Sequence, residues 1–548
     1  MHYIKPVLLT VFLLAMLALL AFGPRGTGGL PKEVQAGVDQ GKITVVTYWE
    51  KWTGKEGEQM GEIVKDFNAT VGKEKGIFIK YLSISEIDKK TLIATAAGVP
   101  PDIAGVWDTQ VSQFSALNAL EPLDDIAAEY GIKPGYYKGV YWKGCTYEGT
   151  LYALISTPAT VALHYNKRLF NEVGLDPDKP PRTIRELDDY AAKLDVVQRD
   201  ARGNITRIDR TGYLPLEPGW FIQHTGYWFG GSLYDEKSHQ MTMTSPPMVA
   251  AFEWIRSYTE RLGPKSVMDF KSGIGNNFDS PQNPFLTGTV AMVQQGTWMA
   301  NYIEKLKPSM NRWNVPGTQA EQNAAREDLL RRLNERATQL AAVKVERAAA
   351  GTTDARRAEL AAKEEELRRE AWVLRKQFRD MCEWAAAPFP SVGKPESPYE
   401  PAIDTPTHAG FDVLTIPRGC KNKRQAFEFI AYVNRQEVME KLCSLHCKNS
   451  PLTKVSEEFL LTHPNAYIEV FDKMAESKNA FGIPPIPIWT EVSDEVGILA
   501  ANTYQMIGPP PREALAIAEK RLQRKVDRFF DRQAIRDREE AAAAAKGK

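Results

Sequence analysis

The sequence predicts an α/β protein that is interrupted by a long helical hairpin and preceded by an apolar segment. Runs of β-branched and aromatic residues alternate with amphipathic helical segments, which is typical of an α/β fold with a mainly parallel sheet. Residues 317–387 contain no proline, although the chain has 35 prolines in all. Residues 7–22 are almost continuously apolar. Together these three observations indicate the fold class.

The composition is that of a globular protein. The chain has 548 residues, of which 43% are hydrophobic and 25% are charged, so a disordered, collagen-like or multi-span membrane protein is excluded. The length predicts about two to four domains. Basic and acidic residues both number 69, so the chain as a whole lacks the charge of a nucleic-acid-binding protein. Seven histidines and five cysteines exclude a dense metal or disulfide scaffold.

The N-terminal segment predicts export from the cytoplasm. No charged residue occurs between Lys5 and Arg25. The apolar length lies between the ~7–15 residues of a signal-peptide core and the ~17–25 residues of a membrane span. No convincing cleavage site follows, and no cysteine lies nearby for lipid attachment. We therefore expect residues 1–41 to form a signal-anchor helix at about 6–23 and a flexible tether, with secretion after cleavage as the alternative.

The predicted elements alternate along the rest of the chain. Strands are expected where β-branched and aromatic residues concentrate, at 43–49, 76–82, 102–107, 161–165, 289–294 and 411–416. Helices are expected where apolar residues recur at helical spacing, at 57–68, 87–97, 166–173, 423–434 and 436–446. Thr183 and Glu186 have the spacing of a capping box, which predicts a helix start. A final helix is expected after the prolines at 509–511, reaching toward residue 540.

The proline-free region predicts an antiparallel helical hairpin or coiled coil inserted at 318–384. Two apolar stripes recur at helical spacing, and they comprise Leu330, Leu333, Ala337 and Leu340, then Leu367, Ala371, Leu374, Phe378 and Met381. Residues 350–354 between them have the composition of a turn with a helix-capping residue. Each arm of about 30 residues has a length of about 45 Å. The pattern favours a self-contained insertion that is separate from the α/β core.

Motifs for common enzyme chemistry are not found. The sequence has no phosphate-binding loop, dinucleotide fingerprint, nucleophile elbow or zinc-protease helix. Cys443, His446 and Cys447 share a helical spacing, but no fourth ligand is evident, so buried thiols or a local disulfide are favoured over a metal site. Neighbouring carboxylates at 124–125 and 494–495 are interpreted as helix caps or solvated faces. A glycosidase pair of carboxylates remains an alternative.

Aromatic residues follow several predicted strands, where open α/β sheets bind their ligands. These strand-end residues are Trp49, Glu50, Trp52, Trp107, Asp108 and Trp298. Trp489 lies in a proline-rich segment, and Trp220, Gln223 and Trp228 cluster in a loop-rich one. Burial in the core is the alternative for any single tryptophan. As a group, flat rings beside hydrogen-bonding side chains indicate a neutral, polyhydroxylated ligand.

A series of short motifs occurs in a characteristic order between residues 42 and 530. They are found at 47–50, 98–103, 120–123, 161–170, 229–235, 285–292, 296–298, 410–417, 426–432 and 449–452. On these motifs the chain resembles the family 1 (maltose-binding-protein-like) extracellular solute-binding proteins of ABC importers. Each motif is weak alone, and their common order and spacing make the resemblance specific.

The resemblance implies a two-lobed, periplasmic-binding-protein-like (type II) clam-shell that closes by a hinge on a carbohydrate. Lobe 1 is expected from 42–157 and 401–450, and lobe 2 from 158–400 and 451–548. The closed form is expected to meet ABC permease subunits in the membrane. The family's motif positions imply ligand-binding roles for Trp49, Glu50, Trp107, Asp108, Trp220, Trp298 and Trp489. Trp52, Gln223, Trp228 and Phe411 are further candidates.

The resemblance implies a binding protein without a cofactor, a metal or an enzymatic activity. Two alternatives stay open at this point. One is a glycan-acting enzyme on a similar scaffold. The other is a membrane-tethered sensor or scaffold that signals through the hairpin at 318–384, because its long polar faces are suited to docking an additional partner.

Overall fold

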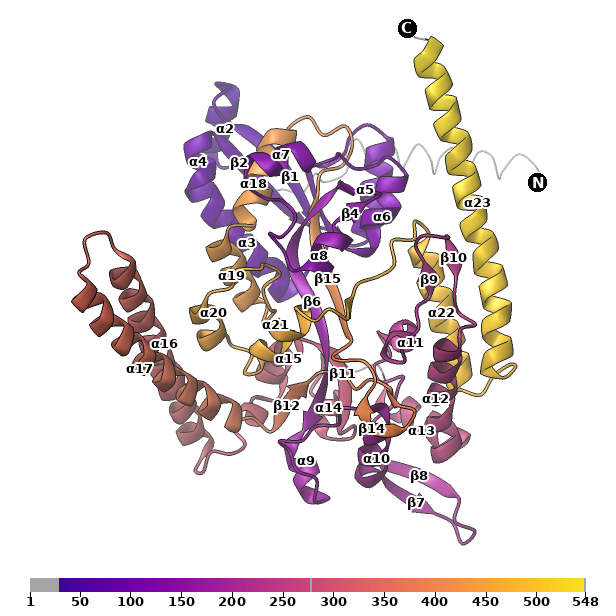
Figure 1. Cartoon of the computed structure of the whole chain (residues 1–548). Coiled ribbons are helices and arrows are strands. Elements are labelled where there is room, and N and C mark those ends of the chain that lie inside the picture. Colours follow the sequence, from indigo (N-terminus) through magenta and orange to yellow (C-terminus); the bar gives the residue numbers. More distant parts are fainter. Residues whose placement is uncertain (1–28, 276–277, 547–548) are drawn as a thin grey trace.

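The computed structural model describes residues 29–275 and 278–546 (Figure 1). The signal-anchor predicted at 6–23 lies outside these residues. Among the residues described, no helix combines the length and the apolar character needed to cross a membrane. Two α/β lobes are arranged one above the other in Figure 1, and a single sheet extends through both of them.

The shared sheet has eight strands. Their order is β11-β6-β15-β3-β1-β2, with β12 also paired to β6 and β16 to β15. The strands are β1 (Thr44–Glu50), β2 (Ile77–Ser83), β3 (Ile103–Trp107), β6 (Ala153–Asn166), β11 (Met292–Gly296), β12 (Trp384–Ala387), β15 (Thr407–Thr415) and β16 (Ala480–Phe481). Strands β6 and β15 pass from one lobe into the other, so they form the connection between the lobes (Figure 1).

The expectation of a mainly parallel sheet is wrong for this central part. Strand β1 is parallel to β2 and β3, but β15 is antiparallel to β3 and β6, and β6 is antiparallel to β11 and β12. The physical reason is the path of the chain. It enters the lower lobe through β6 and returns through β15, so these two neighbouring strands run in opposite directions.

The upper lobe packs helices on both faces of β1, β2 and β3. Its helices are α2 (Lys32–Asp39), α3 (Gly54–Ala69), α4 (Val71–Lys75), α5 (Ile87–Ala96), α6 (Thr109–Ala116), α7 (Asp124–Glu129), α8 (Gly139–Gly144), α18 (Lys423–Val433) and α19 (Gln436–Leu445), with the short pair β4 (Thr146–Tyr147) and β5 (Thr150–Leu151). Its core includes Val46, Phe67, Val106 and Phe429, all fully buried.

The lower lobe has a second core, which includes Phe170, Trp228 and Phe252. Its helices are α9 (Lys167–Glu172), α10 (Ile184–Leu194), η1 (Ile222–His224), α11 (Thr225–Trp228), α12 (Pro246–Leu262), α13 (Pro264–Ile274), α14 (Pro284–Thr287), α15 (Met299–Leu306), η2 (Pro308–Asn311), α22 (Trp489–Tyr504) and α23 (Pro511–Lys546). Its additional strands pair as β7 (Val196–Arg199) with β8 (Ile205–Arg210), β9 (Tyr234–Asp235) with β10 (Gln240–Met241), and β13 (Gly393–Lys394) with β14 (Ser397–Pro401). The predicted capping box at the start of α10 is confirmed.

The segment after residue 451 packs with more than one core. It contains α20 (Glu457–Thr462) and α21 (Ile468–Ala475). Leu452, Phe459 and Ile468 belong to the core of the upper lobe, whereas Leu461 and Phe471 belong to a third core. The lobe boundary expected at residue 451 therefore stays a prediction.

The predicted helical hairpin is confirmed and projects to one side of the molecule (Figure 1). It consists of α16 (Gln319–Ala348) and α17 (Asp354–Asp380), joined by a turn in which Gly351 has a φ of 92°. The capping box of Thr318 and Glu321 starts the first helix. The buried seam comprises Leu329, Leu333, Ala337, Leu340 and Val343 against Leu360, Leu367, Ala371, Leu374 and Phe378. Leu330, which was expected in the seam, is only half-buried, because Leu329 occupies the inward position.

The hairpin is not self-contained, contrary to the sequence-based expectation. Its seam continues into the third core, where it packs with Trp384, Phe471 and Met474. Along its length α16 also packs against α20, and Lys344 forms ion pairs with Glu457 and Glu458 at 2.9 and 3.0 Å. The pattern of polar and apolar residues identified the two helices but not the surface on which they dock.

Candidate functional site

The shared sheet has one face on which residues from both lobes meet. Asp412 on β15 lies directly opposite Trp107 on β3 and Thr157 on β6. Residues paired in this way have their side chains on the same face of a sheet, and alternate residues of a strand point to the opposite face. We call the face with Trp107, Thr157 and Asp412 the front face. The opposite face, to which Phe411 points, is the back face.

A buried charge network lies on the front face at the middle of the sheet. The Nζ atom of Lys51 is 3.1 Å from Asp412 Oδ1, and the Nζ atom of Lys448 is 3.1 Å from Asp412 Oδ2. Lys448 also donates to the Thr157 hydroxyl at 3.0 Å. Burial raises the pKa of Asp412, but Lys51 and Lys448 lower it further, so that it lies at about 2. This carboxylate is therefore ionised and compensated by two cations.

Glu50 is fully buried beneath this network rather than exposed to a ligand. Its carboxylate accepts hydrogen bonds from the Tyr48 hydroxyl and from the backbone N–H groups of Lys51 and Trp52. Burial raises its pKa, and Lys51 opposes that shift. A direct ligand-binding role for Glu50, expected from its position at the strand end, does not fit these contacts. These hydrogen bonds instead hold the backbone turn that positions Lys51.

Exposed and half-buried aromatic rings from both lobes lie on or beside this face. Trp107 is 44% exposed, and Lys51 Nζ lies 5.5 Å from the centre of its ring. Trp298, half-buried, lies over Gly296, which pairs with Val161 on the front face. Its ring is 6.4 Å from Phe221. Beside Phe221, Trp220 is 45% exposed and contacts Phe278 at 4.5 Å between ring centres.

The remaining predicted aromatic residues support this surface rather than form it. Trp52 is buried, with Lys51 and Lys448 over its ring at 4.5 and 5.2 Å. Trp228 is buried in the lower core and donates to the Pro406 carbonyl at 3.1 Å. Trp489 is buried and stacks on His224 at 5.7 Å. The rings of these three tryptophans are thus held by protein contacts.

Two further predicted residues, Trp49 and Gln223, are half-buried like Trp298. Trp49 packs against the core of the upper lobe. Gln223 lies in η1, next to His224. Both remain candidates for ligand contact.

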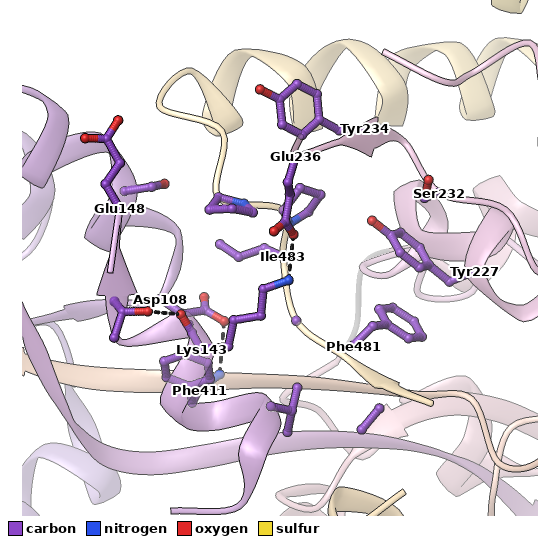
Figure 2. A pocket seen from close by; sticks show the side chains of 18 of the residues that line it. Asp108, Lys143, Glu148, Tyr227, Ser232, Tyr234, Glu236, Phe411, Phe481 and Ile483 are labelled. Carbon is purple, nitrogen blue, oxygen red and sulfur yellow. Dashed lines mark hydrogen bonds and ion pairs between the residues drawn. The ribbon is translucent and has the colours of Figure 1, made fainter. Parts of the chain in front are cut away.

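Asp108 and Phe411 line a cavity of about 470 Å³ between the lobes (Figure 2). The Phe411 ring contacts Tyr141 of α8 edge-on at 5.7 Å, and the Tyr141 hydroxyl is 2.8 Å from that of Thr160. These contacts belong to the back face.

Phe481, which also lines the cavity, pairs with His408 on β15, and their rings are 5.6 Å apart. His408 shares the front face with Asp412, so the cavity reaches both faces at the edge of β15. The sequence grouped all of these residues as one site, and the structure places Asp108 and Phe411 in a cavity beside the aromatic surface.

Lys51, Asp412 and Lys448 are the main residues of the site that sequence reasoning missed. Lys51 lies between two residues that were selected, Glu50 and Trp52, and Asp412 interrupts an apolar strand. A charge inside a predicted buried strand was the available signal, because such a charge needs a partner. Lys448 follows the Cys443–Cys447 cluster, whose thiols are free and form no metal site within the described residues.

Comparisons with known proteins identify the family. The family model described as bacterial extracellular solute-binding protein matches residues 62–458. The chain belongs to this family. Among curated relatives, the sn-glycerol-3-phosphate-binding periplasmic protein UgpB of Escherichia coli (strain K12) is 29% identical over 168 residues. That match covers 28% of this solute-binding protein and 36% of the relative, so the chain spans about a third of the length of the curated relatives it matches.

Solved structures of sugar-binding proteins have the same fold. CpMnBP1 with mannobiose bound has a TM-score of 0.62 at 20% identity, covering 87% of this chain and 99% of that one. The sugar-binding protein MalE of Xanthomonas citri has a TM-score of 0.61 at 18% identity, covering 90% and 99%. The GacH receptor of Streptomyces glaucescens, studied with acarbose, has a TM-score of 0.59 at 19% identity, covering 88% and 98%. The solute-binding protein therefore has the two-lobed fold of these proteins.

Proposed function

We propose that this solute-binding protein captures a carbohydrate on the front face, between its lobes, and delivers it to an ABC importer without chemical change. The observation that carries the proposal is the placement of exposed or half-buried tryptophans from both lobes on or beside one face of the shared sheet. Trp107 comes from the upper lobe, and Trp220 and Trp298 come from the lower one. A hinge movement about β6 and β15 brings such rings onto the two sides of one sugar.

The charges of this face favour a neutral ligand. Both lysines of the network are already paired, with Asp412 between them and Glu50 beside Lys51 at 3.4 Å. A phosphate group needs cations that are free to bind it. Sugar C–H groups, in contrast, pack on flat aromatic faces, and their hydroxyls hydrogen-bond to nearby polar side chains. The proposed cargo is therefore a neutral mono- or oligosaccharide rather than the phosphorylated polyol that names the curated relatives.

The same proposal includes the place of action. The family is described as extracellular, and the apolar stretch at 7–22 suits either a membrane anchor or a secretion signal. We place the protein outside the cytoplasm, with the lobes near the membrane and the permease. The lobe assignment of 42–157 and 401–450 against 158–400 and 451–548 belongs to this proposal.

Replacing Trp107 or Trp298 with alanine is expected to weaken sugar binding about tenfold each, because each change removes one stacking surface of about 1–1.5 kcal/mol. The purified full-length chain is titrated with maltotriose, mannotriose, simple hexoses and glycerol 3-phosphate, and binding is followed by calorimetry. Trp313→Ala serves as the control, because this half-buried ring contacts Lys167 away from the front face.

Three outcomes of this experiment distinguish the proposed function from its alternatives. Sugar binding that weakens in both front-face variants and not in the control supports the proposal. Binding of glycerol 3-phosphate in preference to every sugar contradicts the carbohydrate assignment. Consumption of a glycan during the titration, detected by chromatography, contradicts the non-enzymatic role.

A further inference from the structure

The cavity lined by Asp108 and Phe411, called here the hinge cavity, lies at the edge of strand β15 beside the proposed sugar surface. Its volume of about 470 Å³ falls within the ~300–1,000 Å³ typical of small-molecule sites. Its lining includes Lys143 and Glu148 from the upper lobe, Tyr227 and Glu236 from the lower lobe, and Phe481 of β16 (Figure 2). A molecule in this cavity contacts both lobes and the connection between them.

Acidic side chains outnumber basic ones in the lining. The charged residues are Asp108, Glu148 and Glu236 against the single Lys143. Lys143 is already paired with Glu236 across the lobes, at 2.8 Å (Figure 2). Asp108 and Glu148 are left without a compensating cation in the lining, and Glu148 is exposed at the rim. The cavity therefore has an excess of negative charge.

Asp108 is the buried member of this group, being only 8% exposed. Its carboxylate accepts a hydrogen bond from the Phe411 N–H at 3.2 Å, and none of the salt bridges found among the described residues involves it. Burial and the nearby Asp412 raise its pKa to about 7. A carboxylate in this position is costly to ionise, and a cation placed beside it relieves that cost.

The aromatic part of the lining complements the carboxylates. Tyr227 stacks flat on Phe481, with 4.2 Å between ring centres and 8° between ring planes. Phe411 closes the cavity on the side of Asp108 (Figure 2). Aromatic faces attract cations, and they also cover apolar or flat groups. The cavity thus offers one surface for a positive charge and another for a ring.

We infer that the hinge cavity is a second binding site of this protein, for an organic cation in which a protonated amine is attached to an aromatic or apolar body. The amine is placed between Asp108 and Glu148, and the body lies against the rings of Phe411, Tyr227 and Phe481. This site adjoins the front face where Phe481 packs on His408. It uses none of the tryptophans on the front face.

The experiment titrates the full-length chain with 2-phenylethylamine, its neutral isostere 2-phenylethanol and the anion phenylacetate. We expect the amine to bind at least tenfold more tightly than the alcohol, and phenylacetate to bind most weakly. Asp108→Asn is expected to remove most of the preference for the amine. Glu148→Gln, an exposed change that leaves the fold intact, is expected to reduce it about threefold. Asp125→Asn, an exposed acid elsewhere in the upper lobe, is the matched control.

Equal affinity for the amine and the alcohol overturns the inference. So does an amine preference that neither Asp108→Asn nor Glu148→Gln reduces. Trp107→Ala distinguishes this inference from the proposed function, because the variant is expected to weaken sugar binding and leave amine binding unchanged. Amine binding that is lost in Trp107→Ala places the amine on the front face and contradicts the second site.

Discussion

Replacing Asp412 with asparagine is expected to lower the free energy of unfolding by about 3–5 kcal/mol. The change removes one negative charge and leaves Lys51 and Lys448 without their shared partner. Both lysine side chains are buried, at 3% and 4% exposure, so water cannot replace the carboxylate. Removing one partner of a buried ion pair leaves an uncompensated charge, and that penalty exceeds the net value of the pair itself.

The measurement is urea unfolding of the variant and the parent chain at pH 7, followed by tryptophan fluorescence. Asp66→Asn is the matched control, because Asp66 pairs with Lys441 where both side chains are about half exposed. Exposed pairs contribute little, so the control is expected to change stability by less than about 1 kcal/mol. Adding Lys448→Met to Asp412→Asn is expected to restore part of the loss. A loss below 1 kcal/mol in Asp412→Asn contradicts the assigned role of the network.

The Asp412 carboxylate also makes the free energy of unfolding depend on pH, and the direction of this dependence follows from its pKa. The pKa of Asp412 is about 2 in the folded protein against an ordinary value of 3.8. The unfolded chain therefore binds more protons in this range, and stability rises with pH. The stabilisation is fully present above about pH 4 and is lost as the pH falls toward 2. Asp108, with its pKa raised to about 7, has the opposite sign and acts in a different window, between about pH 4 and 7.

Local elements were predictable from the sequence because their signals are local. The strand expected at 43–49 is Thr44–Glu50, and the helix expected at 87–97 is Ile87–Ala96. Alternation, helical spacing and capping residues each involve neighbours within a few positions. The direction of the central strands was not predictable in this way. It depends on how the chain passes between lobes, and that path is determined by contacts between residues far apart in the sequence.

The candidate site was predicted only in part, because some of its features depend on local sequence and others on long-range contacts. Strand-end positions correctly brought Trp107 and Trp298 to one face, because neighbouring strands of a sheet end near one another. Burial could not be predicted from position, so Trp228 and Trp489 were included although they lie in the core. The partner of a charge such as Asp412 lies 36 residues away at Lys448. No spacing rule connects two such residues.

The second large effect on stability is expected where the helical hairpin packs against the rest of the protein. Arg375→Leu is expected to lower the free energy of unfolding by about 3–5 kcal/mol. Arg375 on α17 is fully buried, and its guanidinium donates to the carbonyls of His463 (2.7 Å) and Asn465. It also lies 3.5 Å from Glu469. Burial lowers its pKa, and Glu469 opposes that shift. Leucine keeps an apolar side chain at this position but leaves the His463 carbonyl without this donor and removes one of the two donors to the Asn465 carbonyl.

Urea unfolding of Arg375→Leu is compared with that of Arg331→Leu, a matched change on α16. Arg331 is 60% exposed and pairs only with Asp328 and Glu335 of its own helix among the described residues, so its loss is expected to cost less than about 1 kcal/mol. A hairpin that is merely appended predicts equal, small effects for both arginines. Unequal effects show that its base contributes to the core around Phe471 and Trp384. Deleting residues 318–384 then removes part of the lobe itself, so partner binding is better tested by substitutions on the exposed faces of α16 and α17.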